Sequence, residues 1–554
     1  PEPDPEPASA EHDEPWPGGR SNHYLFDMNR DWLALSQIET QGRARLGLEW
    51  HPQVVVDLHE MGSESTYYFA PPAEPANPYI TARQRDWLTA FGKENAARFD
   101  ARGFGYFVRE VFDAFYPGYG DSWPIFQGAI SMTFEQASSR GLVVRRSDDT
   151  LLTYRDGVVR HFTAALQTMA TAARNRKALL ADYLEYRRSA VSEGEKAAVR
   201  EYLVPPGADP TRTDAFARHL TRHGIDVRRA DEEIRLASRT LPAGTYVVPA
   251  AQPMYRLLRN LMESDIRMDD AFLQEQERRR QKRLGDQIYD VTAWSLPQLY
   301  DVEVVTSDRP VSVKTTPVTV DREPTAPALA SAKVAYLLPW GSGAARAIVE
   351  AHRAGLKVRS AGEEFTIAGR TYGVGTAIVR VSENGGDLHT RLREIGARTG
   401  AEVVPLDSSW VDKGMSLGSN GVSGLKQPRI VLAWDSPVSS QSAGWARYVL
   451  EQRFGQAVTV VRTSSLRRMD LLRYNVLVLP SGSYGSFSED DIRRIKDWIA
   501  GGRVLVTLAE ASRWASGEKV GLLSASLELR GGKPASTGDE KETKKPSGDT
   551  GKPF

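Results

Sequence analysis

The chain has 554 residues, of which 41% are hydrophobic, and this length predicts three or four globular domains. Its 71 Lys and Arg residues balance 71 Asp and Glu residues, so no net charge favours nucleic acid or anionic lipid as a partner. The absence of Cys excludes disulfides and thiol nucleophiles, and no apolar run is long enough to span a membrane.

The first candidate site follows a Pro-rich and acidic opening, residues 1–20, which we interpret as a linker. Asp27, Asn29 and Arg30 then stand close together in the chain. The planar guanidinium of an Arg binds a carboxylate through two parallel hydrogen bonds. Arg30, with Asn29 beside it, is therefore a candidate ligand for the carboxylate of a substrate.

Two later runs place a His and a Glu in apolar predicted strands. His59 follows the Val-rich stretch 54–56, where its imidazole is suited to a metal. Glu135 stands in an apolar run, where a carboxylate is costly unless it is paired or functional. A zinc peptidase holds its metal with three protein ligands and a water, and a Glu moves the proton. An Arg, a His and a Glu in this order favour that chemistry.

With these motifs, the segment from about residue 21 to 188 resembles the C-terminal part of the catalytic domain of zinc carboxypeptidases of the carboxypeptidase A type. A long closing helix is expected after the Glu, from the helical spacing of Val158, Phe162, Leu166 and Met169. The resemblance implies a function for each site residue: Asn29 and Arg30 on the substrate carboxylate, His59 on zinc, Glu135 as general acid and base, Asp27 as acceptor for a metal-bound His, Tyr119 or else Tyr116 over the substrate, and Arg20 as a candidate second substrate-facing Arg.

The upstream zinc ligands of that family have no counterpart in this sequence. In the family they come from a His-x-x-Glu pair before the Asn-Arg motif, and none of the nine His residues here has a Glu three positions on. His223 with Asp226 comes nearest, but it lies far downstream. We therefore expect a fragment that lacks two of three ligands and holds zinc fully in a longer product. The resemblance favours a periplasmic or secreted location, although the chain shows no signal peptide.

The middle of the chain contains a predicted repeat. Residues 223–233 align without gaps on residues 354–364. Each copy is predicted to contain a strand, a helix and further short strands, which is typical of small α/β layers. We place the two repeat units at residues 191–332 and 333–427.

The last predicted domain, residues 428–530, alternates strand and helix signals, and Ser488 is predicted to cap one of its helices. This layout resembles the flavodoxin-like domain of class I glutamine amidotransferases. Enzymes of that group carry a Cys or Ser on a sharp turn after a strand, whereas the nearest hydroxyl here is Ser512. We expect an interaction or structural domain without a nucleophile. Residues 531–554 are predicted to be a disordered tail.

The sequence thus predicts a multi-domain α/β protein with a partial carboxypeptidase-like α/β/α domain at residues 21–190. The implied activity is zinc-dependent removal of C-terminal residues, with a peptide or protein C-terminus as substrate and no nucleic acid as partner. One alternative is a non-catalytic peptide- or partner-binding protein on the same scaffold. The other, an amidotransferase-like enzyme, is disfavoured by the missing nucleophile.

Overall fold

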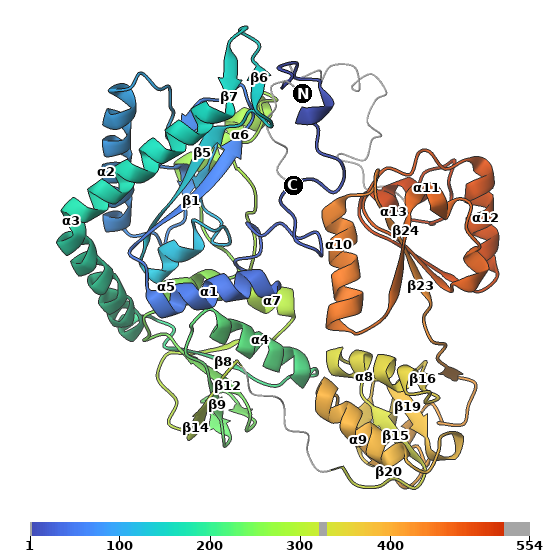
Figure 1. Cartoon of the computed structure of the whole chain (residues 1–554). Coiled ribbons are helices and arrows are strands. Elements are labelled where there is room, and N and C mark those ends of the chain that lie inside the picture. Colours follow the sequence, from blue (N-terminus) through green and yellow to red (C-terminus); the bar gives the residue numbers. More distant parts are fainter. Residues whose placement is uncertain (1–2, 321–328, 526–554) are drawn as a thin grey trace.

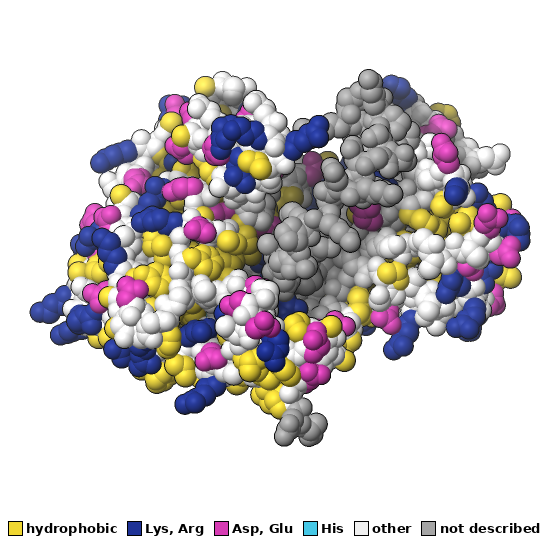
Figure 2. Space-filling view, turned by 90° about the horizontal axis from the view of Figure 1, so that it is seen from above, with side chains coloured by type: hydrophobic (Ala, Val, Ile, Leu, Met, Phe, Trp, Pro, Cys, Tyr) yellow, Lys and Arg dark blue, Asp and Glu magenta, His cyan; other side chains and the backbone are white. Residues whose placement is uncertain are grey.

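A computed structural model describes residues 3–320 and 329–525, and it confirms an α/β protein. We refer to four units: the first (residues 21–196), the second (201–318), the third (329–425) and the fourth (428–525). Figure 1 shows the first and second units on one side of the molecule and the third and fourth on the other. Within the described ranges, no helix has the length and apolar character needed to cross a membrane. Acidic and basic side chains are interspersed on the face in Figure 2.

The first unit contains a three-stranded sheet with the order β1-β5-β2. The strands are β1 (Val54–Met61), β5 (Ile130–Ala137) and β2 (Tyr67–Tyr68). β1 and β5 are parallel, and β2 is antiparallel to β5. Seven of the eight residues of β5 are buried, as expected for a central strand, whereas β1 lies at the edge and its Leu58 is 51% exposed. Two short pairs accompany this sheet: β3 (Ala73–Ala76) with β4 (Asp113–Ala114), and β6 (Val143–Arg145) with β7 (Leu151–Thr153).

Helices α2 (Ala82–Asp100) and α3 (Tyr154–Lys196) pack on each other and on β5 (Figure 1), and α1 (Ile38–Trp50) precedes β1. The predicted closing helix is confirmed as α3. However, the four apolar residues that predict it lie on its exposed face: Val158, Phe162, Leu166 and Met169. The buried face of its first half carries smaller residues instead: Thr163, Ala164, Thr168 and Thr171. Their size lets α2 and α3 approach closely.

The second and third units each contain a five-stranded antiparallel sheet. The second has the order β13-β8-β12-β9-β14 and the third the order β20-β15-β19-β16-β22. The central strands of the second unit are β8 (Glu201–Val204), β12 (Tyr246–Pro249) and β9 (Arg228–Ala230), and its outer strands are β13 (Val305–Ser307) and β14 (Thr315–Pro317). The corresponding central strands of the third unit are β15 (Ala335–Leu338), β19 (Ala377–Arg380) and β16 (Arg359–Ala361), and its outer strands are β20 (Val404–Leu406) and β22 (Val422–Gly424). Hence the strands before, within and after the aligned residues occupy the same places in both sheets.

The helices of these two units are α4 (Pro210–Arg222), α5 (Tyr255–Met262), α6 (Asp270–Gln281) and α7 (Leu296–Tyr300) in the second unit, and α8 (Ser342–Arg353) and α9 (Leu388–Thr399) in the third. In Figure 1, α6 lies beside the strands of the first unit, away from the sheet of the second. Two smaller sheets pair β10 (Ile234–Arg235) with β11 (Thr240–Leu241), and β17 (Phe365–Ile367) with β18 (Arg370–Tyr372) and β21 (Lys413–Gly414). The helix predicted after the first strand of each repeat is thus present, as α4 in the second unit and α8 in the third.

The fourth unit is a four-stranded parallel sheet with the order β24-β23-β25-β26. Its strands are β23 (Ile430–Trp434), β24 (Val458–Arg462), β25 (Val476–Leu479) and β26 (Val504–Thr507), and its helices include α10 (Ser440–Tyr448), α11 (Thr463–Leu466), α12 (Glu489–Ala500) and α13 (Glu510–Ala515). The predicted cap is confirmed, because Ser488 forms a capping box with Asp491 at the start of α12. The predicted tail, residues 531–554, lies outside the described residues.

The segment that carries Asn29 and Arg30 is held between the first and fourth units. The rings of Phe26 and Trp445 lie 4.1 Å apart, and the Tyr448 hydroxyl donates to the Ser36 carbonyl at 2.6 Å. Gly444 of α10 makes this approach possible, since a Cβ there would lie 2.1 Å from the Tyr24 carbonyl oxygen. The fourth unit therefore contributes to the position of the candidate site.

Candidate functional site

The candidate site begins with the register of two parallel strands. Residue His59 of β1 pairs with Glu135 of β5, and Asp57 pairs with Thr133. Side chains two residues apart in a strand lie on the same face of a sheet. Asp57, His59 and Glu135 therefore share one face, so that two residues from different predicted motifs meet.

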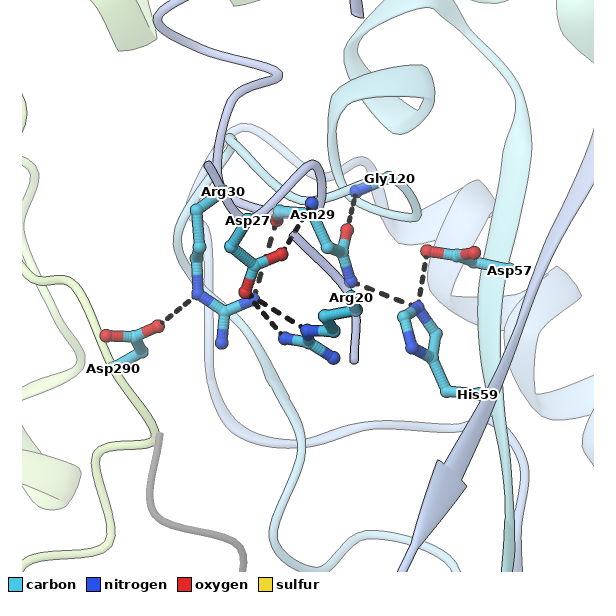
Figure 3. Close-up of polar contacts among 8 residues, drawn as sticks. All are labelled: Arg20, Asp27, Asn29, Arg30, Asp57, His59, Gly120 and Asp290. Carbon is cyan, nitrogen blue, oxygen red and sulfur yellow. Dashed lines mark hydrogen bonds and ion pairs between the residues drawn. The ribbon is translucent and has the colours of Figure 1, made fainter. Parts of the chain in front are cut away.

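Asn29 connects the N-terminal segment to this face (Figure 3). Its Nδ2 lies 3.0 Å from His59 Nε2, and its Oδ1 accepts the backbone N–H of Gly120 at 2.6 Å. That backbone donor fixes the amide so that its nitrogen faces the imidazole. A Cβ at Gly120 would lie 2.6 Å from Asp57 Oδ2, so a larger residue there would displace the Asp57 carboxylate.

His59 has two polar neighbours on one nitrogen. Its Nε2 lies 2.7 Å from Asp57 Oδ2 as well as 3.0 Å from Asn29 Nδ2. Nε2 donates to Asp57 when it carries a proton and accepts from Asn29 when it does not. Burial acts to lower the pKa of His59, but the hydrogen bond to Asp57 and the negative charge of Asp57 outweigh it and raise that pKa. The protonated state that binds Asp57 is thereby favoured.

Glu135 is a buried carboxyl group, with 8% of the residue exposed. Desolvation is the main cause that raises its pKa to about 8, against the opposing charges of His59 and Arg20. Desolvation, with the nearby Asp57, also raises the pKa of Asp121 to about 6. At neutral pH, Glu135 is mostly protonated and is able to donate a proton, and above pH 8 it is able to accept one.

Two Arg residues of the site are already paired with carboxylates (Figure 3). Arg20 donates to Asp27 Oδ2 from Nη2 at 2.7 Å and from Nε at 3.2 Å. Arg30 donates from Nε to Asp290 Oδ2 at 2.7 Å, and its guanidinium lies 4.6 Å from the centre of the Tyr119 ring. Tyr119 thus contacts Arg30, and its place over a substrate stays a prediction. Tyr116 is also buried, with its ring 5.0 Å from that of Tyr119.

The environment of Asp27 differs from the one predicted for it. The resemblance implies an acceptor for a metal-bound His, whereas the Asp27 carboxylate binds Arg20 and accepts the Asn29 backbone N–H at 2.8 Å. The carboxylate that contacts a His in the described residues of this site is Asp57. The sequence does contain a signal for this contact, because Asp57 stands two residues before His59 in a predicted strand, which places both side chains on the same face.

Two further site residues were not predicted. His161 of α3 contacts the His59 carbonyl through Nε2 at 3.1 Å and the Tyr67 hydroxyl through Nδ1 at 2.9 Å. It therefore links the closing helix to the backbone of β1. Asp290 comes from the second unit, 260 residues after Arg30, and no motif around it points to the first unit.

The described residues do not fit zinc as a complete ligand set. No group of three or more His, Asp or Glu side chains in these ranges is arranged to hold a metal ion. His59 Nε2 and Asp57 Oδ2 are adjacent, but zinc peptidases use three protein ligands and a water. The neighbouring Glu60 is turned toward Ser138, whose hydroxyl donates to it at 2.9 Å.

The fourth unit has a strained turn where β26 ends. Ala509 stands there with φ 47° and ψ −115°, a conformation that costs energy for a residue with a Cβ. The turn borders a cavity of about 940 Å³ between the loops that follow β23, β25 and β26. Ala509 offers no nucleophile, and the Ser512 hydroxyl is paired with that of Thr507 at 2.9 Å. No described His contacts Ser512, as a Ser nucleophile would require.

Comparison of the chain with protein-family models, with curated proteins and with solved structures gave no match in any of the three searches.

Proposed function

We propose that this protein is a zinc carboxypeptidase-like hydrolase that acts on the C-terminal residue of a peptide. Arg30 and Asn29 hold the substrate carboxylate, and Glu135 moves the proton. The observation that carries the proposal is the meeting of three separate chain segments at one face of the sheet. Asn29 contacts His59 at 3.0 Å, and His59 and Glu135 are register partners.

The hydroxyl of Tyr119 gives independent support for a ligand beside Arg30. This oxygen is buried and has no hydrogen-bond partner among the described residues. A buried polar atom without a partner is costly, and such atoms are rare in folded proteins. A substrate whose carboxylate binds Arg30 brings acceptor oxygens to the same place, since the Tyr119 ring packs on that guanidinium.

Glu135 supports the hydrolytic part of the proposal. A general acid or base works best when its pKa is near the working pH, and the Glu135 pKa of about 8 is in that range. Zinc would supply an activated water, but the described residues offer it two donor groups, so the proposal depends on carboxylate recognition and proton transfer.

The test compares one N-acylated dipeptide as the free acid and as the amide. We expect the unmutated protein to bind the acid more tightly in calorimetry, and Arg30→Ala to remove most of that preference, about 10- to 100-fold. Arg83 is a matched control, because its Nε also pairs with an Asp, at 2.8 Å, and its guanidinium also lies over an aromatic ring. Equal binding of acid and amide by the unmutated protein contradicts the proposal.

A second candidate is a peptide-binding protein without hydrolysis. The observation that favours it is the incomplete set of zinc donors around His59. Product analysis of the same dipeptide, incubated with the protein and added zinc, separates the two functions. Release of the C-terminal amino acid supports the hydrolase, and tight acid-specific binding without release supports the second candidate.

A further inference from the structure

The contact between Arg30 and Asp290 joins two units of the protein at the candidate site. Asp290 lies in the loop between α6 and α7 of the second unit, and both side chains are mostly buried, at 18% and 19% exposure. The ion pair uses Nε of Arg30, on the side edge of the guanidinium. The end edge, formed by Nη1 and Nη2, has no carboxylate on it among the described residues, and Nη1 makes a long 3.5 Å contact with the Asn29 carbonyl.

This arrangement leaves the end edge of Arg30 without a carboxylate among the described residues, so a substrate carboxylate can bind there. A guanidinium presents two parallel donors to a carboxylate either from its end or from its side. Asp290 occupies the side, Tyr119 covers one face of the group, and the Tyr289 side chain hydrogen-bonds it from nearby, with its ring centre 6.0 Å away. The end edge is the approach at which two parallel donors remain for a substrate carboxylate.

The loop that carries Asp290 is firmly attached to the first unit. The backbone N–H of Tyr289 donates to Asp113 Oδ2 at 3.0 Å, and its ring lies 5.4 Å from that of Phe112. Trp294, a few residues later, lies 5.3 Å from Phe115, and its Nε1 donates to the Asn260 carbonyl at 2.9 Å. Moving Asp290 away would break several of these contacts, so the loop is a fixed part of the site.

We propose that Asp290 is a positioning residue, which holds the Arg30 guanidinium so that its Nη1 and Nη2 atoms face the substrate carboxylate. The second unit then completes the carboxylate site of the first. This inference rests on the proposed function. The opposite arrangement, in which Asp290 is a gate that the substrate must displace, predicts tighter substrate binding when Asp290 loses its charge.

The experiment measures binding of the free acid and the amide dipeptide to Asp290→Asn and Asp290→Glu. We expect Asp290→Asn to weaken binding of the acid about 3- to 10-fold and to leave the amide unchanged, and Asp290→Glu to recover part of the loss. Asp182→Asn is the matched control, because Asp182 is the Nε partner of Arg83 away from the site. This control is expected to bind both ligands as the unmutated protein does.

Each other outcome has a defined meaning. Tighter acid binding in Asp290→Asn overturns positioning in favour of a gate, and an equal loss for acid and amide shows a merely structural contribution. If the unmutated protein does not distinguish acid from amide, the proposed function fails instead. The Arg30 Nε–H signal in NMR, assigned by its loss in Arg30→Lys, then still tests the contact, because it shifts in Asp290→Asn only if Asp290 holds Arg30.

Discussion

One face of the parallel strands β1 and β5 and the carboxyl end of the parallel strand β26 carry different groups. On β1 and β5, Asp57, His59 and Glu135 share one face, where the pKa of His59 is raised by Asp57 and that of Glu135 by burial. After β26, the strained position is occupied by Ala509, which has no ionisable group. Parallel strands in two parts of a protein therefore do not imply similar chemistry, because the reacting groups are the side chains that the strands carry.

The sharpest test of this difference is the substitution Glu135→Gln. It removes proton transfer and keeps the shape of the side chain, so in an assay with zinc in excess we expect peptide hydrolysis to fall about 10²- to 10⁴-fold while dipeptide affinity stays within about 2-fold. Hydrolysis rates and calorimetry on the same samples measure the two effects. The controls are Ser512→Ala at the fourth sheet and Glu64→Gln, which is exposed. Loss of activity in Ser512→Ala would place the chemistry in the fourth unit.

The two sheets also differ in how deeply their strands are buried. Leu432 in β23 is fully buried, whereas Leu58 in β1 is 51% exposed. We expect Leu432→Ala to destabilise the fourth unit by about 2–5 kcal/mol and Leu58→Ala to cost under about 1 kcal/mol. Thermal unfolding followed by calorimetry measures both. A large effect of Leu58→Ala would show that another surface covers the edge of β1 in solution.

A smaller effect is expected in the pH dependence of stability. The Glu135 pKa is about 8 in the folded state and about 4.3 in an unfolded chain, so the folded state binds this proton more tightly. The contribution of Glu135 to the free energy of unfolding is therefore largest below about pH 4.3 and is lost as the pH rises through about 8. We expect Glu135→Gln to raise the melting temperature more at pH 9 than at pH 5. An equal change at both pH values would contradict a raised pKa.

The smallest expected effect concerns zinc. His59 and Asp57 are two donors rather than three, so we expect most added zinc to be lost on dialysis and His59→Ala to remove what remains. Metal analysis before and after dialysis measures this. One zinc per chain that survives dialysis, and disappears in His59→Ala, would reveal ligands beyond those of the described site.

Much of the fold was predictable because local signals are strong in this chain. The alternation of strands and helices, the capping box at Ser488 and the long helix after Glu135 all follow from residue patterns. Which face of that helix is buried was not predictable from the same patterns, since Phe162 is 62% exposed and Ala164 is buried. Apolar spacing predicts a helix but does not determine which face packs, and here small residues pack closely against α2.

The site was predictable only where its residues belong to motifs. Asn29, His59 and Glu135 come from three such motifs, and the structure brings them together. Asp57 follows from strand periodicity once His59 is placed on a strand. Asp290 could not be predicted, because its contact depends on how the second unit docks on the first, and a single Asp in a loop carries no signal of that.

The length of helix α3 affects how the first and second units are placed relative to each other. Its 43 residues rise about 65 Å along the helix axis, which bends in Figure 1, and the helix starts beside the candidate site and ends at the second unit. Near the far end, Arg256 of α5 donates to the Tyr186 carbonyl at 2.8 Å and pairs with Glu193. One inserted residue would rotate this end by about 100° relative to the start. Because α5 of the second unit is attached to this end, the residue count of α3 contributes to where the second unit lies relative to the first.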